Sequence, residues 1–148
     1  MDKLTYKRAT RKDISKLVEL DKKCFNRDFD NSFTEKEFET CLTQSGDTGF
    51  IYLNKTIIGF YSWVDIDNEE SEIVGIAILP EYQKHGYGTT GVKMMLDSLK
   101  DKKKIKIVTH PKNTIALKMY KNLGFVVSGF SKDHYGPNQP RVVLYKIK

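Results

Sequence analysis

Hydrophobic and polar positions along this chain predict strands that alternate with helices. Residues 4–10 alternate as a half-buried strand does, and residues 104–110 do the same. Residues 72–79 are apolar nearly throughout, which indicates a strand that is buried on both faces. The other strands are expected as a pair within 49–66, with a turn at Asn54-Lys55, and over 125–130 and 141–147.

Helix ends are marked by capping patterns. Thr10 and Asp13 form the first, and Thr34 with Glu37 forms a capping box before a helix that runs to about Leu42. Apolar positions at helical spacing follow each signal. The other helical stretches are Ile14 to Leu20 after the first cap, the residues after a glycine loop to about Leu99 (with Val92, Met95, Leu96 and Leu99 on one side), and Asn113 to Gly124.

The predicted order is one strand, two helices, three strands, a helix, a strand, a helix and two strands. A strand–helix–strand crossover from residue 72 to residue 110 requires two of the strands to be parallel. This order predicts an α/β fold, a mixed sheet of about seven strands with flanking helices. With 148 residues and no linker or repeat, the chain is expected to be a single domain over 1–148.

Composition excludes several classes of protein. The balance of 39% hydrophobic and 30% charged residues is that of a globular chain rather than a disordered one. No apolar run approaches the ~20 residues that span a bilayer, and the start lacks the apolar core of a signal peptide. A cytoplasmic protein without membrane partners is therefore expected, with Cys24 and Cys41 as reduced thiols. The scattered His and Cys residues indicate no metal site.

Charge is the next feature, because the net charge of +6 favours an anionic partner. Nucleic acid is one such partner, but the chain has no helix-turn-helix, RNA-recognition or zinc-finger pattern, so none is expected. The charges are also segregated. Residues 65–72 are strongly acidic and residues 100–106 are strongly basic.

The stretch QKHGYGTTG, residues 83–91, fits two glycine patterns at once. Gly86, Gly88 and Gly91 spell the dinucleotide fingerprint, but no acidic residue ends the next strand to hold a ribose, and no Gly-Lys-Ser/Thr follows for a P-loop. Gly91 is better explained as a helix-packing residue. Gln83, Gly86 and Gly88 instead predict a loop whose backbone N–H groups converge on a phosphate or pyrophosphate at a helix N-terminus.

A second motif follows about 30 residues later. Asn113, Ala116, Tyr120, Gly124 and Phe125 spell N-x-x-A-x-x-x-Y-x-x-x-G-F. Alone, this is an ordinary capped amphipathic helix. With the glycine loop before it, the chain closely resembles the GNAT superfamily of N-acetyltransferases over most of its length, and the resemblance implies the GNAT acyl-CoA N-acyltransferase fold.

That resemblance implies an acetyl-CoA site. The cofactor-binding residues that it implies are Gln83, Lys84, His85, Gly86, Tyr87, Gly88 and Thr89 for the pyrophosphate, the backbone of Ile76, Ala77 and Ile78 for the pantetheine arm, and Asn113 at the cofactor's edge. Strands 72–79 and 104–110 should splay apart to admit the cofactor. The basic residues 100–104 are a candidate for the adenosine phosphates, alongside the plainer interpretation of a solvated turn.

The resemblance also implies catalytic residues. Tyr120 would act as the acid for the leaving thiolate, and its alternative role is that of a core aromatic. Glu72 is the expected base, because it matches the glutamate of histone-type members and strand alternation places it with Val74, Ile76 and Ile78. Its alternative is a solvated glutamate at the edge of a strand. His110 is the second candidate base, and water alone is the third.

Ribosomal-protein alanine acetyltransferases of this family carry a glutamate where this chain has Val108. Because Cys24 and Cys41 match no nucleophile motif, the expected reaction is direct acetyl transfer to a primary amine, most simply a cationic one such as a polyamine, a lysine side chain or an aminoglycoside. Acidic residues at 65–72 and in the stretch 26–33, which carries Asp28, Asp30 and Phe33, motivate the cationic acceptor, and His134 and Tyr135 are expected on the opposite wall. A protein N-terminus and a non-catalytic acyl-CoA-binding module are the alternatives. A homodimer is left open.

Overall fold

The computed structural model describes residues 3–24, 34–43 and 45–148. Its strands are β1 (Leu4–Arg8), β2 (Gly46–Leu53), β3 (Thr56–Asp65), β4 (Glu70–Ile78), β5 (Lys104–Thr109), β6 (Val126–Ser131) and β7 (Arg141–Ile147). Its α-helices are α1 (Ile14–Cys24), α2 (Glu35–Thr43), α3 (Tyr87–Ser98) and α4 (Thr114–Asn122). The order of elements predicted from the sequence is confirmed, with two short 3-10 turns, η1 (Arg11–Asp13) and η2 (Pro80–Tyr82), in addition.

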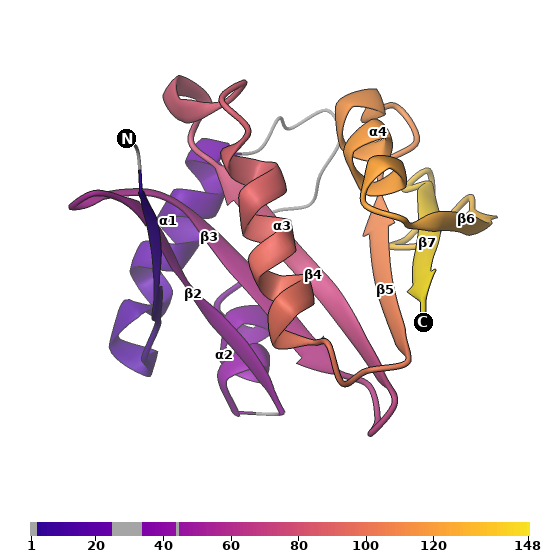
Figure 1. Ribbon diagram of the computed structural model, residues 1–148, viewed down its shortest axis with the longest axis horizontal. Coiled ribbons are helices and arrows are strands. Elements are labelled where there is room, and N and C mark those ends of the chain that lie inside the picture. Colours follow the sequence, from indigo (N-terminus) through magenta and orange to yellow (C-terminus); the bar gives the residue numbers. More distant parts are fainter. Residues whose placement is uncertain (1–2, 25–33, 44) are drawn as a thin grey trace.

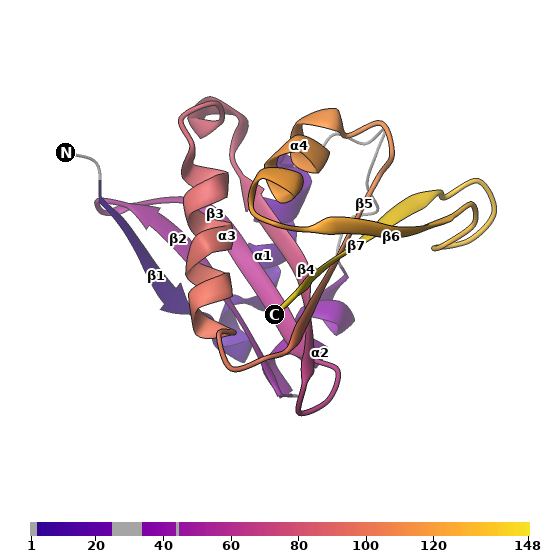
Figure 2. The ribbon, with the colours of Figure 1, turned by 45° about the vertical axis from the view of Figure 1, so that its right-hand side comes forward.

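A single seven-stranded sheet organises the molecule. Its strand order is β1-β2-β3-β4-β5-β7-β6, and only the β4–β5 pair among neighbours is parallel. Helices α3 and α4 cover one face and α1 and α2 the other, as Figures 1 and 2 show from two directions. The mixed α/β fold is thus confirmed.

Local sequence explains where the helices begin. Thr10 and Asp13 form the predicted capping box, in which the Thr10 amide donates to Asp13 Oδ2 at 2.9 Å. Thr34 and Glu37 form the second, with the Glu37 amide donating to Thr34 Oγ1 at 3.2 Å. Asn113 accepts from the Ala116 amide through its side chain. Each cap satisfies a backbone N–H that has no partner within its own helix.

Two hydrophobic clusters lie on opposite faces of the sheet. The cluster beneath α3 and α4 includes Val92, Met95 and Leu99, the side of α3 that its periodicity predicts. The cluster beneath α1 and α2 includes Phe38 and Phe60, whose rings meet edge to face with centroids 5.4 Å apart. The cluster that a strand side chain faces therefore shows on which face of the sheet that side chain lies.

Gly91 lets α3 lie close to β4. A Cβ at this position would lie 2.8 Å from Ile76 Cδ1, so the predicted packing role is confirmed. We expect Gly91→Val to lower the free energy of unfolding by about 1–3 kcal/mol, because it overpacks this contact. Urea unfolding measures the loss. Gly129→Val is the control, since a Cβ at Gly129 meets nothing within 4 Å, and an equal loss in both variants would contradict the packing role.

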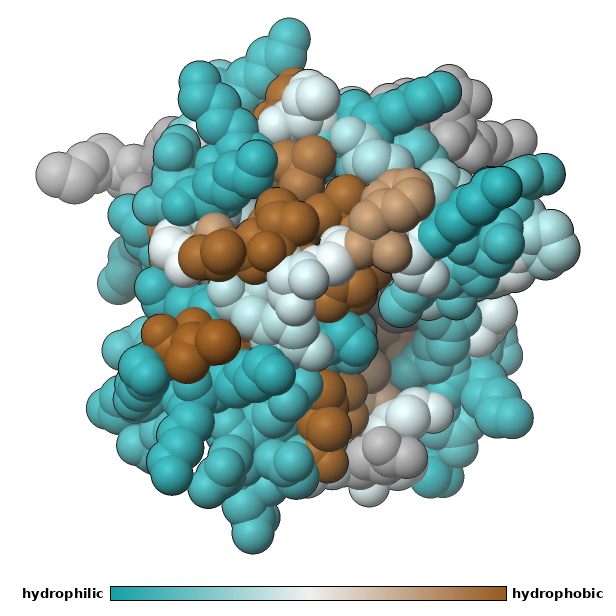
Figure 3. All heavy atoms as spheres, turned by 90° about the vertical axis from the view of Figure 1, so that its right-hand side faces the viewer, coloured by the Kyte–Doolittle hydropathy of each residue, from teal (hydrophilic) through white to brown (hydrophobic). Residues whose placement is uncertain are grey.

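Strand β6 forms one edge of the sheet and carries exposed apolar side chains. Val126, Val127 and Phe130 are exposed, as is Ile147 of β7. Figure 3 shows hydrophobic side chains gathered on the face at this end of the molecule.

No helix among the described residues combines the length and the apolar content that a membrane span requires. The cytoplasmic location stays a prediction.

Candidate active site

Strands β4 and β5 separate halfway along β4. They pair only from Glu70 opposite Lys104 to Ile73 opposite Ile107. Beyond this point β5 remains paired with β7, where Val108 is opposite Val143, and β4 remains paired with β3. The predicted splay is therefore present. It leaves the β5-side edge of residues 74–78 without a neighbouring strand among the described residues.

The backbone of β4 presents alternate residues to this gap. The Leu79 amide donates to Ile58 O at 2.7 Å, so residue 79 points toward β3. Because successive residues point to opposite edges, Ala77 also faces β3, whereas Ile76 and Ile78 face the gap. A ligand in the gap would thus meet the backbone of Ile76 and Ile78 rather than that of Ala77.

The glycine loop closes one end of the gap. Gly86 precedes α3 with φ of 83°, and Lys84 has φ of 67°. These left-handed residues turn the chain so that the first amides of α3, at Tyr87, Gly88 and Thr89, point out of the helix end without an acceptor inside the helix. Such an end attracts an anion through its amides and its dipole.

Gln83 fixes the loop to the strand instead of pointing freely. Its Nε2 donates to Ile78 O at 2.8 Å. This bond occupies one of the gap-facing backbone groups and holds the loop above the end of β4. Gln83 therefore positions the loop, a role that the pattern of residues 83–88 did not reveal.

Gly88 leaves room beside the helix end. A Cβ there would lie at ordinary contact distance, 3.9 Å from Ile78 Cγ1 and 4.0 Å from Met119 Sδ. The protein itself therefore does not require glycine at this position. The contact with Met119 also shows that α4 lies beside the first turn of α3.

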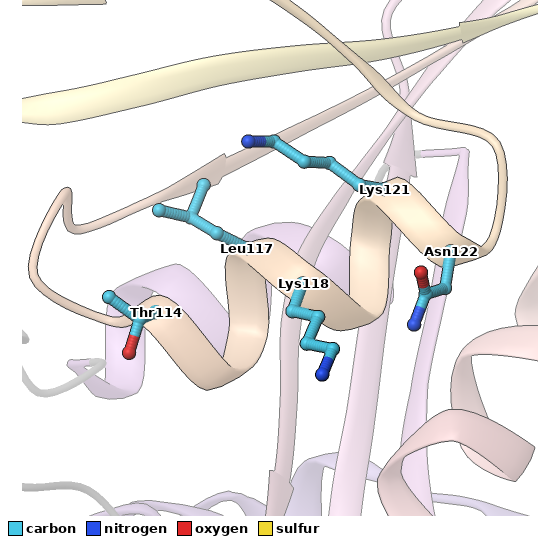
Figure 4. Close-up of a pocket in the computed structure, with 5 residues that line it drawn as sticks. All are labelled: Thr114, Leu117, Lys118, Lys121 and Asn122. Carbon is cyan, nitrogen blue, oxygen red and sulfur yellow. The ribbon is translucent and has the colours of Figure 1, made fainter.

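A shallow hollow on α4 adds basic groups to this neighbourhood. It is lined by Thr114, Leu117, Lys118, Lys121 and Asn122. Figure 4 shows Lys118 and Asn122 extending from one side of α4, with Leu117 and Lys121 on the other. Lys118 is next in sequence to Met119, which makes it a candidate phosphate contact that the sequence motifs did not single out.

Tyr120 lies in the cluster beneath α3 and α4. Its side chain is 6% exposed, and its ring meets that of Phe125 edge to face at 5.9 Å. This position on α4 is the predicted one. The role of its hydroxyl stays a prediction.

Glu72 faces the opposite side of the sheet from the one expected. Ser62 pairs with Gly75 and Trp63 with Ile73, so Val74 is an extra residue in β4. Such a bulge reverses the alternation beyond it. Ile73, Ile76 and Ile78 all pack in the cluster beneath α3, while Glu72 shares its face with Ala77, on the α1/α2 side. The expected grouping with Ile76 and Ile78 is therefore wrong.

The surroundings of Glu72 are half-buried and contain a cation. Burial raises the pKa of its carboxyl, the nearby charge of Lys106 lowers it, and Glu70 raises it further. Lys106 lies directly across the β4–β5 pair, with its Nζ 4.0 Å from Glu72 Oε1. A carboxylate whose pKa is raised is suited to take up a proton near neutral pH.

His110 follows β5 on the far side of the gap from β4. It is 8% exposed, and its Nδ1 accepts from the Lys112 amide at 3.0 Å. That bond makes Nδ1 an acceptor, so in the neutral ring the proton is on Nε2. To act as the base, His110 would have to give up this bond and take the proton at Nδ1.

The acidic and basic segments neutralise each other. Lys102 Nζ lies 3.3 Å from Asp65 Oδ1, and Lys103 Nζ lies 3.2 Å from Glu69 Oε1. Both segments lie at the C-terminal end of α3, about 18 Å from the glycine loop by the rise of a 12-residue helix. This placement contradicts the expectation that residues 100–104 hold the adenosine phosphates. It also pairs two carboxylates of the acidic turn, Asp65 and Glu69, with lysines, which weakens the turn's attraction for a cationic acceptor.

Two other expectations concern the walls of the acceptor site. Asp28, Asp30 and Phe33 lie outside the described residues. His134 and Tyr135 lie in the β6–β7 hairpin, and Tyr135 stacks on Arg141 with the guanidinium carbon 4.9 Å from the ring centre.

Neither Arg141 nor Lys106 was singled out from the sequence. Lys106 could have been found by aligning the alternation of 104–110 with that of 70–73.

Comparisons with known proteins agree with this geometry. A family model described as "Acetyltransferase (GNAT) family" matches residues 14–125. Among solved structures, a GNAT family acetyltransferase from Elizabethkingia anophelis with acetyl-CoA bound is 23% identical, with a TM-score of 0.76 and 100% of each chain covered.

Two further structures share the fold. The ribosomal-protein-S18-alanine N-acetyltransferase from Escherichia coli is 17% identical with a TM-score of 0.83, covering 98% of this chain and 94% of that one. A spermidine N-acetyltransferase mutant from Vibrio cholerae is 21% identical with a TM-score of 0.76, covering 97% and 93%. These likenesses establish the fold, and the family match extends over well over half of the sequence. The chain therefore belongs to the GNAT family of acetyltransferases.

Proposed function

We propose that this acetyltransferase moves the acetyl group of acetyl-CoA directly to a primary amine. One observation carries the proposal: the gap between β4 and β5 opens directly below a glycine loop whose helix amides suit a pyrophosphate. The gap would take the pantetheine arm as an added strand, and the loop would anchor the rest of the cofactor.

The cofactor contacts follow from this placement. The amides of Tyr87, Gly88 and Thr89 would hold the pyrophosphate, with Lys84 and His85 beside them. The backbone of Ile76 and Ile78 would pair with the pantetheine. Asn113, at the start of α4, would lie at the cofactor's edge, and Lys118 would add a cation for the adenosine phosphates.

The chemistry then needs three events. The amine nitrogen attacks the thioester carbonyl carbon, the C–S bond breaks with its electron pair on sulfur, and the nitrogen loses a proton. A side-chain amine with a pKa near 10.4 is almost wholly protonated at pH 7, so a base is needed. Glu72 is the proposed base, with His110 as the alternative. Tyr120 would donate a proton to the thiolate, and a backbone N–H of β4 would stabilise the oxyanion.

The acceptor is proposed here only as a primary amine. The cationic class rested partly on the acidic turn, of which Asp65 pairs with Lys102 and Glu69 with Lys103. A protein N-terminus stays an alternative, although Val108 occupies the position of the glutamate of the ribosomal-protein type. A non-catalytic acyl-CoA-binding module would keep the loop and the gap but give no turnover.

A CoA-release assay tests the reaction. Acetyl-CoA is supplied at mildly alkaline pH with spermidine, a lysine peptide, a peptide with a free N-terminus, an aminoglycoside or free amino acids. Release above a blank without acceptor is expected for at least one class. Binding of acetyl-CoA without release for any class would favour the binding module.

Gly88→Ala tests the cofactor site within the same assay. Alanine favours the helix over glycine by about 1 kcal/mol, so the variant should be at least as stable as the wild type in thermal unfolding. Its methyl group would occupy the space beside the pyrophosphate, and we expect the Kd for acetyl-CoA in calorimetry to rise by about tenfold or more. An unchanged Kd would place the cofactor elsewhere.

A further inference from the structure

Arg141 is a buried cation without an acidic partner. The residue is 3% exposed, at the start of β7. Among the described residues (3–24, 34–43 and 45–148), no carboxylate lies within 4 Å of its guanidinium. Its polar contact is the 2.6 Å bond that Nη1 donates to Pro140 O, the carbonyl of the preceding residue. A guanidinium has five N–H donors, so this one bond leaves most of its capacity unused.

The groups around Arg141 are positive or aromatic. The Tyr135 ring stacks on the guanidinium from the β6–β7 hairpin, which shields one of its flat faces and leaves its donor edge for another partner. His134 lies close enough to Arg141 and Lys106 that their charges, together with its burial as the first cause, lower the pKa of its imidazole. Glu72 also lies on this face, beside Lys106.

The strand pairing places Glu72, Lys106 and Arg141 near the point where β4 and β5 separate. Val142 pairs with Thr109 and points toward the cluster beneath α3 and α4, so Arg141, one residue earlier, points to the face that carries Glu72. Lys106 and Glu72 lie level with each other just before the separation, and Arg141 lies just beyond it. The gap that would present the thioester lies on the β4 side of β5, and Arg141 lies across β5 from it, on β7.

Burying a cation that has no anionic partner is costly, and selection tolerates this cost where the charge meets a ligand. We propose that Arg141 binds a carboxylate of the acceptor, so that the substrate is an amine that also carries an acid group, as an amino acid does. This inference rests on the proposed function and names its acceptor class. A guanidinium suits a carboxylate because its N–H groups match the two oxygens.

This acceptor class also fits the net charge of the face. Lys106 and Arg141 outnumber Glu72, so the face would repel a polyamine and attract an anion. The amine of an amino acid could then meet Glu72 while its carboxylate meets Arg141. The purely cationic acceptor predicted from the acidic turn would carry no group that could pair with Arg141.

Matched acceptor pairs test the proposal. Each α-amino acid of a panel is compared with its α-amide, and Nα-acetyl-lysine with Nα-acetyl-lysinamide, which places the acid far from the reacting amine. For at least one pair, we expect the wild type to acetylate the acid with a kcat/KM about tenfold or more above that of the amide. Equal rates for acid and amide in every pair that turns over would overturn the proposal while leaving the acetyltransferase in place.

Arg141→Gln should erase this preference. The kcat/KM for the acid should fall to that of the amide, while the amide rate and the Kd for acetyl-CoA stay within about threefold of the wild type. Arg11→Gln is the matched control, because Arg11 lies on the exposed surface near Glu39, and it should keep the preference. A loss of acid and amide rates alike in Arg141→Gln would count against carboxylate binding.

Stability separates a binding role from a structural one. An unpaired buried cation does not stabilise the fold, so Arg141→Met should have a Tm equal to or above that of the wild type without ligand. A clear drop in Tm would mean that Arg141 holds the hairpin instead. If no acceptor is acetylated, calorimetric titration of the amino acids into the CoA complex still tests the carboxylate site. Binding to the wild type that is lost in Arg141→Gln supports the site. Absence of binding to the wild type refutes it.

Discussion

Replacing Glu72 by Gln is expected to lower kcat by about 10²–10⁴, the usual contribution of a positioned general base. The amine must lose a proton, and Glu72, the proposed base, lies on β4 just before β4 separates from β5. Because burial raises the pKa of this carboxyl, the wild-type rate should rise with pH through a value above the ordinary range of glutamate. The acidic limb of the kcat/KM profile should disappear in Glu72→Gln.

The stability of the same variant has a defined sign. A carboxyl whose pKa is raised in the folded state is stabilising below its unfolded pKa, where it is neutral, and loses that contribution as pH rises through the folded pKa. Gln has no such loss. The Tm of Glu72→Gln relative to the wild type should therefore increase with pH across this window, as measured by thermal unfolding.

Glu70→Gln is the matched control for Glu72. Glu70 lies two residues earlier on the same face of β4, and its charge raises the pKa of Glu72. This variant should keep kcat within about twofold, since Glu70 is not the base, and should move the acidic limb slightly to lower pH. A wild-type rate in Glu72→Gln would shift the role of base to His110 or to water.

Replacing Tyr120 by Phe is expected to lower kcat by about 10² or more, because the thiolate would leave without a proton donor. The ring contact with Phe125 survives the change, so the loss of stability should not exceed about 1.5 kcal/mol, the value of one hydrogen bond. Acetyl-CoA affinity, measured by calorimetry, should change little. Steady-state kinetics with the best acceptor measures the effect on kcat.

Tyr52→Phe serves as the control for Tyr120→Phe. Tyr52 is half-buried on β2 and packs against the cluster on the opposite face of the sheet. It should retain full activity. If both variants keep the wild-type kcat, Tyr120 is a core aromatic, and the thiolate leaves without its help.

The sequence by itself determined the order of elements, the helix caps and the glycine loop. These features depend on residues within one or two turns of each other, such as Thr34 with Glu37 or Asn113 with Ala116. The Gly86 conformation is equally local, because a left-handed turn before a helix favours glycine wherever it occurs. The family resemblance rested on the same short-range motifs, and the family match agrees with it.

Only the tertiary structure decided how the charged side chains are presented. A bulge at Val74, set by the pairing of β4 with β3, turned Glu72 to the α1/α2 face. Lysines distant in sequence pair with carboxylates of the acidic turn beside the parallel β4–β5 pairing, as the 34-residue separation of Lys103 and Glu69 illustrates. Arg141 became a buried cation on the face that carries Glu72 through the pairing of β7 with β5. Register and burial arise between segments distant in sequence, so no local pattern specifies them.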